Sequence, residues 1–218
     1  MPTFKALYKV ADISYCQSKL DWNALVNAGF KGVIIRCGYL NKTDTSFIDH
    51  ITTAIRYGLH IGIYTYIMSR NPYDALAEAE ETINRIRPYA KYIDLGVWSD
   101  VEDARTLKDR DAAQISAITQ TFLECIKSHG FVCGLYSNPS TLMNYYKPVV
   151  YKTYPVWLAH WAANSKYLPV YNPHIWQYGT EKINGTPVDS NYVFSDMSEI
   201  TDSNNTAFMK RLNAGLLW

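Results

Sequence analysis

The 218-residue sequence has little net charge and no long apolar run. Lys and Arg total 21 against 20 Asp and Glu, so the chain has no overall positive field that would hold nucleic acid. No stretch approaches the roughly 18 apolar residues that span a bilayer, and we expect no membrane insertion. The first residues also lack the apolar segment of a signal peptide, which predicts a chain made in the cytoplasm.

Motifs for metals and nucleotides are absent too. The four cysteines form no CxxC pair and the five histidines have no HExxH or i, i+4 spacing, so we expect no metal site and no cofactor. No GxGxxG, Walker A or GxSxG motif occurs, which argues against dinucleotide binding, P-loop chemistry and an esterase-type nucleophile. We expect the cysteines to be small buried apolar residues of a reducing compartment.

The sequence is rich in aromatic residues, with 18 Tyr and 6 Trp. Such rings suit surfaces that stack on sugars or bases, although most of them are expected in the core. With 48% hydrophobic and 19% charged residues, the rest of the composition is that of an ordinary folded domain.

An amphipathic helix, a glycine and a short apolar strand follow one another three times along the chain. The glycines are Gly29, Gly58 and Gly130, and a glycine directly after a helix is typical of a left-handed C-cap. A further predicted helix begins at Asn71-Pro72 and carries a stripe from Leu76 to Ile86. This order is typical of alternating β/α units.

Eight segments are predicted to be strands, namely residues 8–14, 32–37, 60–66, 95–101, 132–136, 155–159, 174–178 and 187–191. Helices can follow the first five, but the stretch from Ala159 to His174 is short and carries two prolines. The Asn184-Gly185 pair favours a tight hairpin, so the last two strands are expected to be antiparallel. We therefore predict an α/β fold, a modified TIM-like barrel of about five β/α units followed by three strands. A doubly wound open sheet is the alternative, which no nucleotide-binding loop supports.

Four acidic residues lie at the ends of the predicted strands. In barrels of this kind the active site lies at the carboxyl ends of the strands, where Asp12 ends the first strand and Asp100 and Glu102 end the fourth. Asp189 lies in the eighth strand, which barrel closure places beside the first. We therefore expect the four carboxylates at one end of the barrel.

Asp100 and Glu102 form a pair on one side of their strand, with Cα atoms about 6.6 Å apart. Burial and like-charge repulsion raise the pKa of one carboxyl, which then holds a proton near neutral pH while its neighbours stay ionised. This arrangement suits cleavage of a glycosidic bond. The alternative is a solvated loop, since Asp103, Arg105 and Lys108 follow directly.

The order of short motifs along the chain resembles that of one enzyme family. The motifs lie between about Val10 and Phe194 and are Asp12-Ile13-Ser14-Tyr15-Cys16-Gln17, Asp21-Trp22, Gly32-Val33-Ile34-Ile35-Arg36, Gly62-Ile63-Tyr64, Asp100-Val101-Glu102, Gly134-Leu135-Tyr136, Trp157-Leu158-Ala159, Trp176-Gln177-Tyr178 and Val188-Asp189-Ser190-Asn191. Together they resemble the family 25 glycoside hydrolases, the Chalaropsis-type lysozymes that cut bacterial peptidoglycan, many of which are phage endolysins. Two departures are Thr65, where the family often has histidine, and polar Ser99 before the acidic pair.

The resemblance implies an N-acetylmuramidase without a cofactor, which hydrolyses the β-1,4 bond between N-acetylmuramic acid and N-acetylglucosamine. Glu102 matches the proton donor of the family, and its other active-site carboxylates are matched by Asp100, Asp12 and Asp189. The positions that match the substrate groove are Arg36, Tyr64, Tyr136, Trp157 and Gln177. Because Asp100 lies beside Glu102, we hypothesise retention by substrate-assisted catalysis, in which Asp100 orients the N-acetyl group.

Three other functions are weighed against this one. A catalytically silent barrel that binds wall glycan would normally lose an acid, and none is missing here. A metal-dependent hydrolase would use Asp12, Asp100 and Asp189 as ligands, but the sequence offers no matching histidine. A chitinase-like glycosidase would act on polymers of N-acetylglucosamine with the same carboxylates.

The domain prediction is a catalytic barrel over residues 1–196 and a C-terminal extension or linker stub over residues 197–218, in which residues 204–216 are a candidate last helix. The implied partner is the bacterial peptidoglycan strand, with any separate wall-binding module lying outside this chain. The implied place of action is the bacterial cell wall. A phage endolysin would reach the wall through a membrane pore, whereas a trimmed secreted autolysin would be exported to it.

Overall fold

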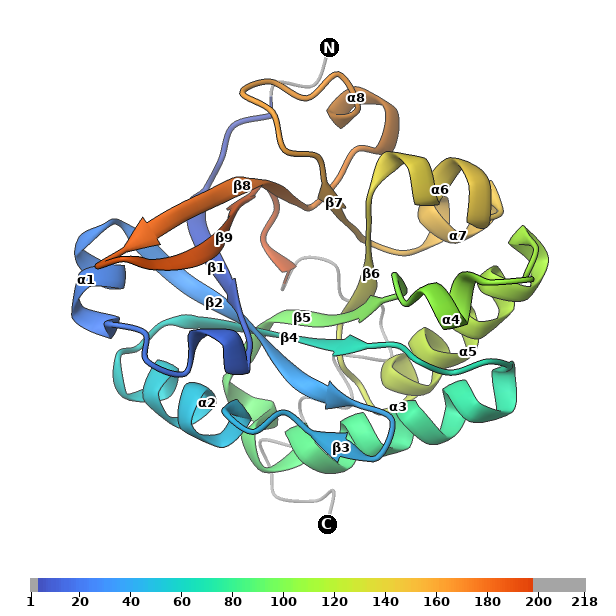
Figure 1. Cartoon of the computed structure of the whole chain (residues 1–218), viewed down its shortest axis with the longest axis horizontal. Helices are drawn as coiled ribbons and strands as arrows, with labels where there is room; N and C mark the ends of the chain where they lie inside the picture. Colours follow the sequence, from blue (N-terminus) through green and yellow to red (C-terminus); the bar gives the residue numbers. More distant parts are fainter. Residues whose placement is uncertain (1–3, 198–218) are drawn as a thin grey trace.

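The apolar segments that alternate with helices become the strands of one mixed sheet (Figure 1). The computed structural model describes residues 4–197. The strands are β1 (Tyr8–Ile13), β2 (Phe30–Tyr39), β3 (Lys42–Thr43), β4 (His60–Tyr66), β5 (Ile93–Asp100), β6 (Cys133–Ser137), β7 (Val156–Ala159), β8 (Ile175–Ile183) and β9 (Thr186–Val193). The sheet order is β1-β9-β8-β7-β6-β5-β4-β2-β3, and pairing of β1 with β2 closes it. The predicted barrel of eight strands is confirmed, with β3 as one short extra strand.

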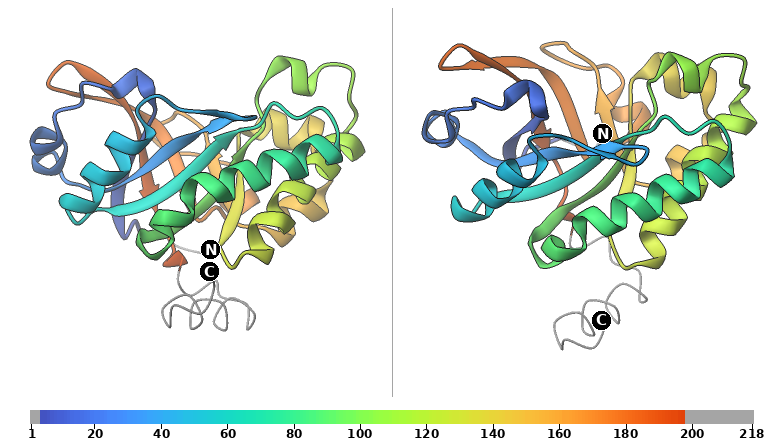
Figure 2. Two further views of the ribbon diagram at one scale, coloured as in Figure 1. Left: turned by 90° about the horizontal axis from the view of Figure 1, so that it is seen from below. Right: turned by 60° about the horizontal axis from the view of Figure 1, so that its bottom comes forward.

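Helices follow the first five barrel strands, as predicted. They are α1 (Trp22–Asn27), α2 (Phe47–Arg56), α3 (Pro72–Ile86), α4 (Ala104–Leu107), α5 (Ala112–Ser128), α6 (Pro139–Tyr145), α7 (Pro148–Thr153) and α8 (Leu168–Tyr171), with the 3-10 helices η1 (Tyr15–Gln17) and η2 (Arg87–Tyr92). Only the four-residue α8 lies between β7 and β8, where the two prolines limit helix length. Figure 2 shows α3 and α5 packed side by side on the outside of the barrel.

Local backbone signals in the sequence explain most helix ends. Gly29, Gly58 and Gly130 have φ angles of +88°, +63° and +83°, which confirms them as left-handed C-caps. Asn71 accepts a hydrogen bond from the amide of Asp74 at 2.9 Å and starts α3. The predicted apolar stripe from Leu76 to Ile86 is wrong at Leu76, which is 41% exposed and lies off the buried face of α3.

The cysteine prediction holds for only part of the set. Cys37 and Cys133 are buried, whereas Cys16 is exposed and Cys125 is half-buried. Cys16 lies in η1, a single turn on the surface that has no buried residue of its own. The prediction of buried cysteines is therefore wrong for Cys16.

The last strand closes the barrel in the reverse direction. β9 pairs antiparallel with both β8 and β1, and Asp12 lies directly opposite Asp189 in this pairing. The turn between β8 and β9 is formed by Asn184 and Gly185, with φ angles of +44° and +86°, as the Asn-Gly pair predicts. The side chain of Asn184 donates to Asp21 at 2.7 Å and ties the hairpin tip to the start of α1.

Two tryptophans fill the inside of the barrel. Trp98 from β5 and Trp157 from β7 meet edge to face, with ring centroids 6.0 Å apart. They are the largest members of an inner cluster that also contains Val10, Ile34, Leu95, Ile175, Val193 and Met197. The Trp98 indole donates to the carbonyl of Leu95 at 2.8 Å, so its polar atom is satisfied. A separate outer cluster packs the strands against the helices.

The lower end of the barrel is closed by Met197, which is 1% exposed and belongs to the inner cluster. The predicted domain boundary falls next to this residue. The rest of the predicted C-terminal extension, including the candidate helix over residues 204–216, lies outside the described residues. No helix in the described part of the chain is long and apolar enough to cross a membrane.

We predict that Gly134→Ala destabilises the barrel. A Cβ atom at Gly134 would lie 2.5 Å from Cζ3 of Trp98 and would also clash with the carbonyl oxygen of Pro155. Because both neighbours are fixed by packing, the free energy of unfolding should fall by about 1–3 kcal/mol in urea titrations. Gly134→Ser, with one more heavy atom, should lose more, and a midpoint equal to the parent's for both variants would contradict this account of the core.

Candidate active site

A polar layer lies above the two tryptophans. Side chains alternate along a strand, so the residue two positions beyond each inner apolar residue also faces the barrel interior. Val10 is thus followed by Asp12, Ile34 by Arg36 and Trp98 by Asp100. With Gln177 after Ile175 and the polar residues at the same end of the other strands, they form the polar layer, which comprises Asp12, Arg36, Tyr64, Asp100, Tyr136, Gln177, Asn191 and Asp189. All of these residues lie at the end of the barrel where the parallel strands have their carboxyl ends.

Glu102 lies close enough to Asp100 to influence its ionisation. Asp100 is 8% exposed, and its Oδ1 atom is buried without a hydrogen-bond partner among the described residues. Burial raises the pKa of Asp100 well above its usual value, and the nearby Glu102 and Asp12 raise it further. Burial also raises the pKa of Glu102, although Asn138 opposes this by donating to Oε1 at 3.1 Å. The pair therefore holds a proton more readily than ordinary carboxyls do.

Asp12 and Asp189 form a second pair across the β1–β9 pairing. Burial and the charge of Asp189 raise the pKa of Asp12. Two amide donors stabilise the ionised form, because Asn191 and Gln177 reach the same Oδ2 atom of Asp12 at 2.9 and 3.1 Å. Asp189 accepts a hydrogen bond from the Thr180 hydroxyl at 2.8 Å. All four predicted carboxylates thus lie at one end of the barrel.

Four of the predicted groove residues form one aromatic and amide cluster. The rings of Tyr64 and Tyr136 meet Trp157 edge to face, with centroids 6.1 and 4.5 Å away. Trp157 is 2% exposed and supports the two tyrosines from below instead of presenting its own face. Gln177 is also buried and accepts hydrogen bonds from the Tyr136 hydroxyl at 3.2 Å and the Trp161 indole at 2.9 Å.

Arg36 is the residue that β2 contributes to the polar layer. Its guanidinium pairs with Asp44 at 2.7 Å and lies over the ring of Tyr15, 4.9 Å from the centroid. The charge of Arg36 also opposes the rise in the pKa of Asp100. Within residues 4–197, no three His, Cys, Asp or Glu side chains are grouped as ligands for a metal ion.

Comparison with known proteins places this geometry in a family. The family model described as Glycosyl hydrolases family 25 matches residues 11–186. The chain belongs to this family. Among curated proteins, no sequence matches the chain.

Solved structures of family 25 glycosyl hydrolases and related wall enzymes have a similar fold. The modular autolysin LytC from Streptococcus pneumoniae, solved with a synthetic peptidoglycan ligand, is 26% identical with a TM-score of 0.76, and the match covers 88% of this chain and 47% of LytC. A family 25 glycosyl hydrolase from Bacillus anthracis is 18% identical with a TM-score of 0.76, covering 92% and 94%. The catalytic domain of endolysin ply40 from a Listeria monocytogenes bacteriophage is 20% identical with a TM-score of 0.72, covering 91% and 98%. The chain thus spans about half the length of LytC.

Several residues of the candidate site were not singled out from the sequence. Asn138 contacts Glu102, Asp44 holds Arg36, and the 60% exposed Trp161 is anchored to Gln177. Asn138 directly follows β6 and Trp161 is the second residue after β7, so their position after a predicted strand was the available signal. Asn191 appears in the motif around Asp189, but its bridge from Trp157 to Asp12 depends on barrel closure.

We predict that Asn138→Ser raises the pKa of Glu102. The Asn138 amide donates to the Glu102 carboxylate and stabilises its ionised form, so loss of this donor favours the protonated form. Serine keeps an oxygen that can cap α6 at the amide of Thr141. Carbon-detected NMR titration of Glu102 should show the movement to higher pH. Asn144→Ser, the same change on the exposed side of α6, should leave the Glu102 titration unchanged, and an unchanged Glu102 in Asn138→Ser would contradict the assignment.

Proposed function

We propose that the protein is an N-acetylmuramidase that hydrolyses the β-1,4 bond between N-acetylmuramic acid and N-acetylglucosamine in bacterial peptidoglycan. Glu102 is the general acid, while Asp100, Asp12 and Asp189 are the further catalytic carboxylates. The observation that carries the proposal is the pair of Glu102 and Asp100 at the mouth of the barrel, both with raised pKa values caused first by burial. An acid that keeps its proton near neutral pH is what a glycosidic oxygen needs as its donor.

The surroundings of the carboxylates suit a sugar chain. Trp161 presents an exposed ring beside β7 while its indole N–H is held by Gln177, and Tyr15 presents a half-exposed ring above which Arg36 lies. Rings fixed in this way offer flat apolar faces for pyranose stacking. Arg36, Tyr64 and Tyr136 line the space between them, and Trp157 and Gln177 hold that lining in place from below.

The comparisons support peptidoglycan as the substrate class. LytC was solved with a peptidoglycan ligand, and ply40 is described as an endolysin. We place the action of this protein at the bacterial cell wall on the same ground. The structural relatives LytC and CTP1L are longer than this chain, which covers 47% and 70% of them. We therefore propose that a barrel of this kind acts together with a separate wall-binding module outside this chain.

The mechanism that fits the site is retention with help from the substrate. Glu102 gives its proton to the glycosidic oxygen, and the carbonyl oxygen of the N-acetyl group of muramic acid attacks the anomeric carbon from the other face. This attack forms a second ring between the acetamido group and the anomeric carbon. Water opens that ring by adding to the anomeric carbon, and a proton of the water returns to Glu102. The Oδ1 atom of Asp100, which has no hydrogen-bond partner within residues 4–197, accepts the N–H of that acetamido group. This hydrogen bond favours ionised Asp100, although burial alone favours its protonated form.

We predict that Glu102→Gln abolishes lysis of purified bacterial walls. The amide is nearly isosteric but has no proton to give, so the rate should fall at least about a hundredfold. Release of reducing ends from walls measures the rate, with chitin as the second substrate and a chelator in parallel assays. Glu124→Gln, the same change on the outer helix α5, is the matched control and should retain the parent rate.

Two checks make this result decisive. A melting temperature within a few degrees of the parent's shows that Glu102→Gln is folded. Wall lysis by Glu102→Gln at the parent rate would remove Glu102 from its role. Faster cleavage of chitin than of walls by the parent protein would instead identify a chitinase.

We predict that cleavage depends on the N-acetyl group through Asp100. De-N-acetylated walls should be cut far more slowly than the same walls after re-acetylation, because the internal nucleophile is missing. Asp100→Asn should lower the cleavage rate on acetylated walls by about tenfold or more. The difference in cleavage rate between acetylated and de-N-acetylated walls should therefore be smaller for this variant than for the parent. Rapid NMR of the parent reaction should find the β anomer first. An initial α product, or equal cleavage of both walls by the parent, would exclude this route.

A further inference from the structure

A cavity lies outside the candidate active site. It has a volume of about 510 Å³ and lies between the end of β2, the loop after β4 and the segment from α4 to α5. None of the four catalytic carboxylates lines this cavity. Its volume is in the range of pockets that take small organic groups. We call it the basic pocket because positively charged side chains line it.

The charge of the basic pocket is strongly positive. Arg70, Arg105, Lys108 and Arg110 line it, together with one carboxylate, Asp109. Arg105 forms an ion pair with Asp103 at 2.9 Å. In the described part of the chain no carboxylate lies within 4 Å of the charged atoms of the other three cations. For a protein whose overall charge is only +1, Arg70, Lys108 and Arg110 are a local excess of positive charge that no ion pair within residues 4–197 neutralises.

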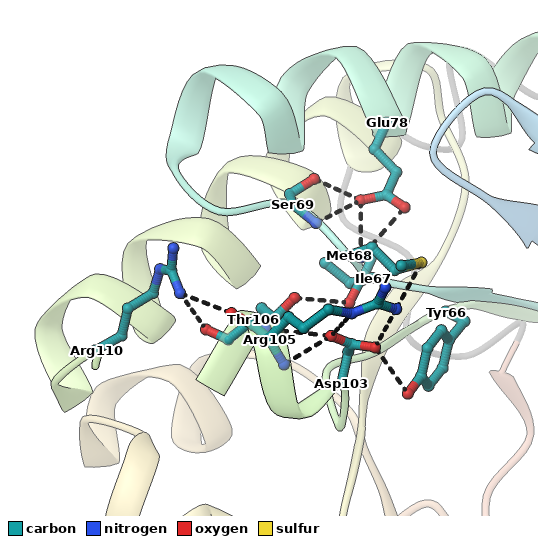
Figure 3. Close-up of polar contacts among 9 residues, drawn as sticks. All are labelled: Tyr66, Ile67, Met68, Ser69, Glu78, Asp103, Arg105, Thr106 and Arg110. Atoms are coloured by element: carbon teal, nitrogen blue, oxygen red, sulfur yellow. Dashed lines mark hydrogen bonds and ion pairs between the residues drawn. The ribbon is translucent and has the colours of Figure 1, made fainter. Parts of the chain in front are cut away.

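Hydrogen bonds from the Arg110 side chain to backbone carbonyls hold the backbone around the basic pocket. Arg110 donates to the carbonyl of Arg70 at 2.9 Å and to three carbonyls of residues 105–108 at 2.9 to 3.0 Å. Carbonyl oxygens fix the guanidinium without neutralising its charge. Figure 3 shows the Arg110 contacts with the carbonyls of Arg105 and Thr106, and the hydrogen bond from the Thr106 hydroxyl to the carbonyl of Ile67, which joins the segments after β4 and β5.

Glu78 forms the support on the other side of the basic pocket. It is 2% exposed and accepts hydrogen bonds from the amides of Leu40 at 2.6 Å, Met68 at 3.2 Å and Ser69 at 3.1 Å, and also from the Ser69 hydroxyl. One carboxylate on α3 therefore holds both the end of β2 and the loop after β4. Leu40 and Met68 supply an apolar wall next to the cations.

The basic pocket adjoins the catalytic groove through short connections. Tyr66 pairs with Asp100 in the β4–β5 register, and the next amide, that of Ile67, donates to the Asp100 carbonyl at 2.7 Å. The Tyr66 hydroxyl donates to Asp103 at 3.4 Å, and Asp103 receives the Arg105 side chain at 2.9 and 3.0 Å (Figure 3). The segment after β5 thus carries Glu102 of the candidate site and Arg105 of the basic pocket three residues apart, which is our basis for linking the two.

We propose that the basic pocket binds a carboxylate of the peptide that substitutes the wall glycan, and this proposal rests on the proposed function. Guanidinium groups bind carboxylates through paired hydrogen bonds, and lysine adds a point charge. The side chains of Arg70 and Lys108 make no hydrogen bond or ion pair within the described residues, so both are available to a ligand. The apolar wall of Leu40 and Met68 suits the methyl groups and backbone of a short peptide better than a phosphate polymer.

The test compares substrates that differ only in the peptide. Soluble glycan chains are prepared with intact peptides, with the peptides removed by an amidase, and with the peptide carboxylates converted to carboxamides. The parent protein should show a kcat/KM on intact chains about tenfold above that on the other two, with the difference carried by KM. Equal values on all three would overturn the proposal while leaving muramidase activity established.

The variant Arg70→Gln/Lys108→Gln should lose this preference and cut peptide-free chains at the parent rate. Lys31→Gln/Lys91→Gln makes the same change in charge at the opposite end of the barrel, and it should keep the preference. An unchanged preference in the pocket variant would overturn the proposal. No cleavage of any chain by the parent would instead remove the proposed function, and the pocket proposal with it.

A phosphate-containing wall polymer is the competing occupant. Walls with and without such polymers are therefore compared for the parent and the pocket variant. A loss of lysis that appears only when the phosphate polymers are present, without any peptide preference on soluble chains, would assign the basic pocket to phosphate and overturn the proposal. Equal loss on both kinds of wall is the result expected for a peptide carboxylate.

Discussion

The packing of Trp98 and Trp157 inside the barrel determines where the chemistry can lie. Their rings fill the interior to a fixed depth, and the next residues on the same strand faces form the polar layer. Water is excluded from below this layer, so the carboxylates there are desolvated on one side. Desolvation is the first cause of the raised pKa values of Asp12, Asp100 and Glu102. The same packing thus provides both the stability of the barrel and the acidity range of its site.

Patterns of short range predicted the barrel well. The strand segments, the glycine caps and the Asn184-Gly185 turn are local signals, because each depends on backbone preferences or on alternation within a few residues. The position of Asp12 opposite Asp189 followed from closure of the barrel alone. The family resemblance supplied the proposed roles of individual side chains, which alternation by itself cannot distinguish.

The residues that escaped prediction act between segments that are distant in sequence. Glu78 looks like an ordinary helix residue, yet it is buried because it binds amides from the end of β2 and the loop after β4. Trp157 matches a groove position, but its depth in the barrel became visible only once Tyr64 and Tyr136 were placed above it. Leu76 illustrates the reverse case, since its spacing fits a stripe whose centre is shifted by the contacts of Glu78 and Thr82. Such contacts depend on how loops are arranged in space, and no periodic pattern in the sequence indicates them.

Because β9 runs antiparallel to β1, Asp189 and the end of the barrel sequence lie at opposite ends of the barrel. Asp189 reaches the polar layer near the start of this strand, and by Val193 the backbone is again opposite Tyr8 at the other end of the barrel. Met197 then closes that end from below. Had β9 run parallel to β1, the chain would have left the barrel beside the carboxylates. As built, a polypeptide fused after Met197 would emerge on the side opposite the groove, so the fold provides an attachment point that does not obstruct an incoming polymer.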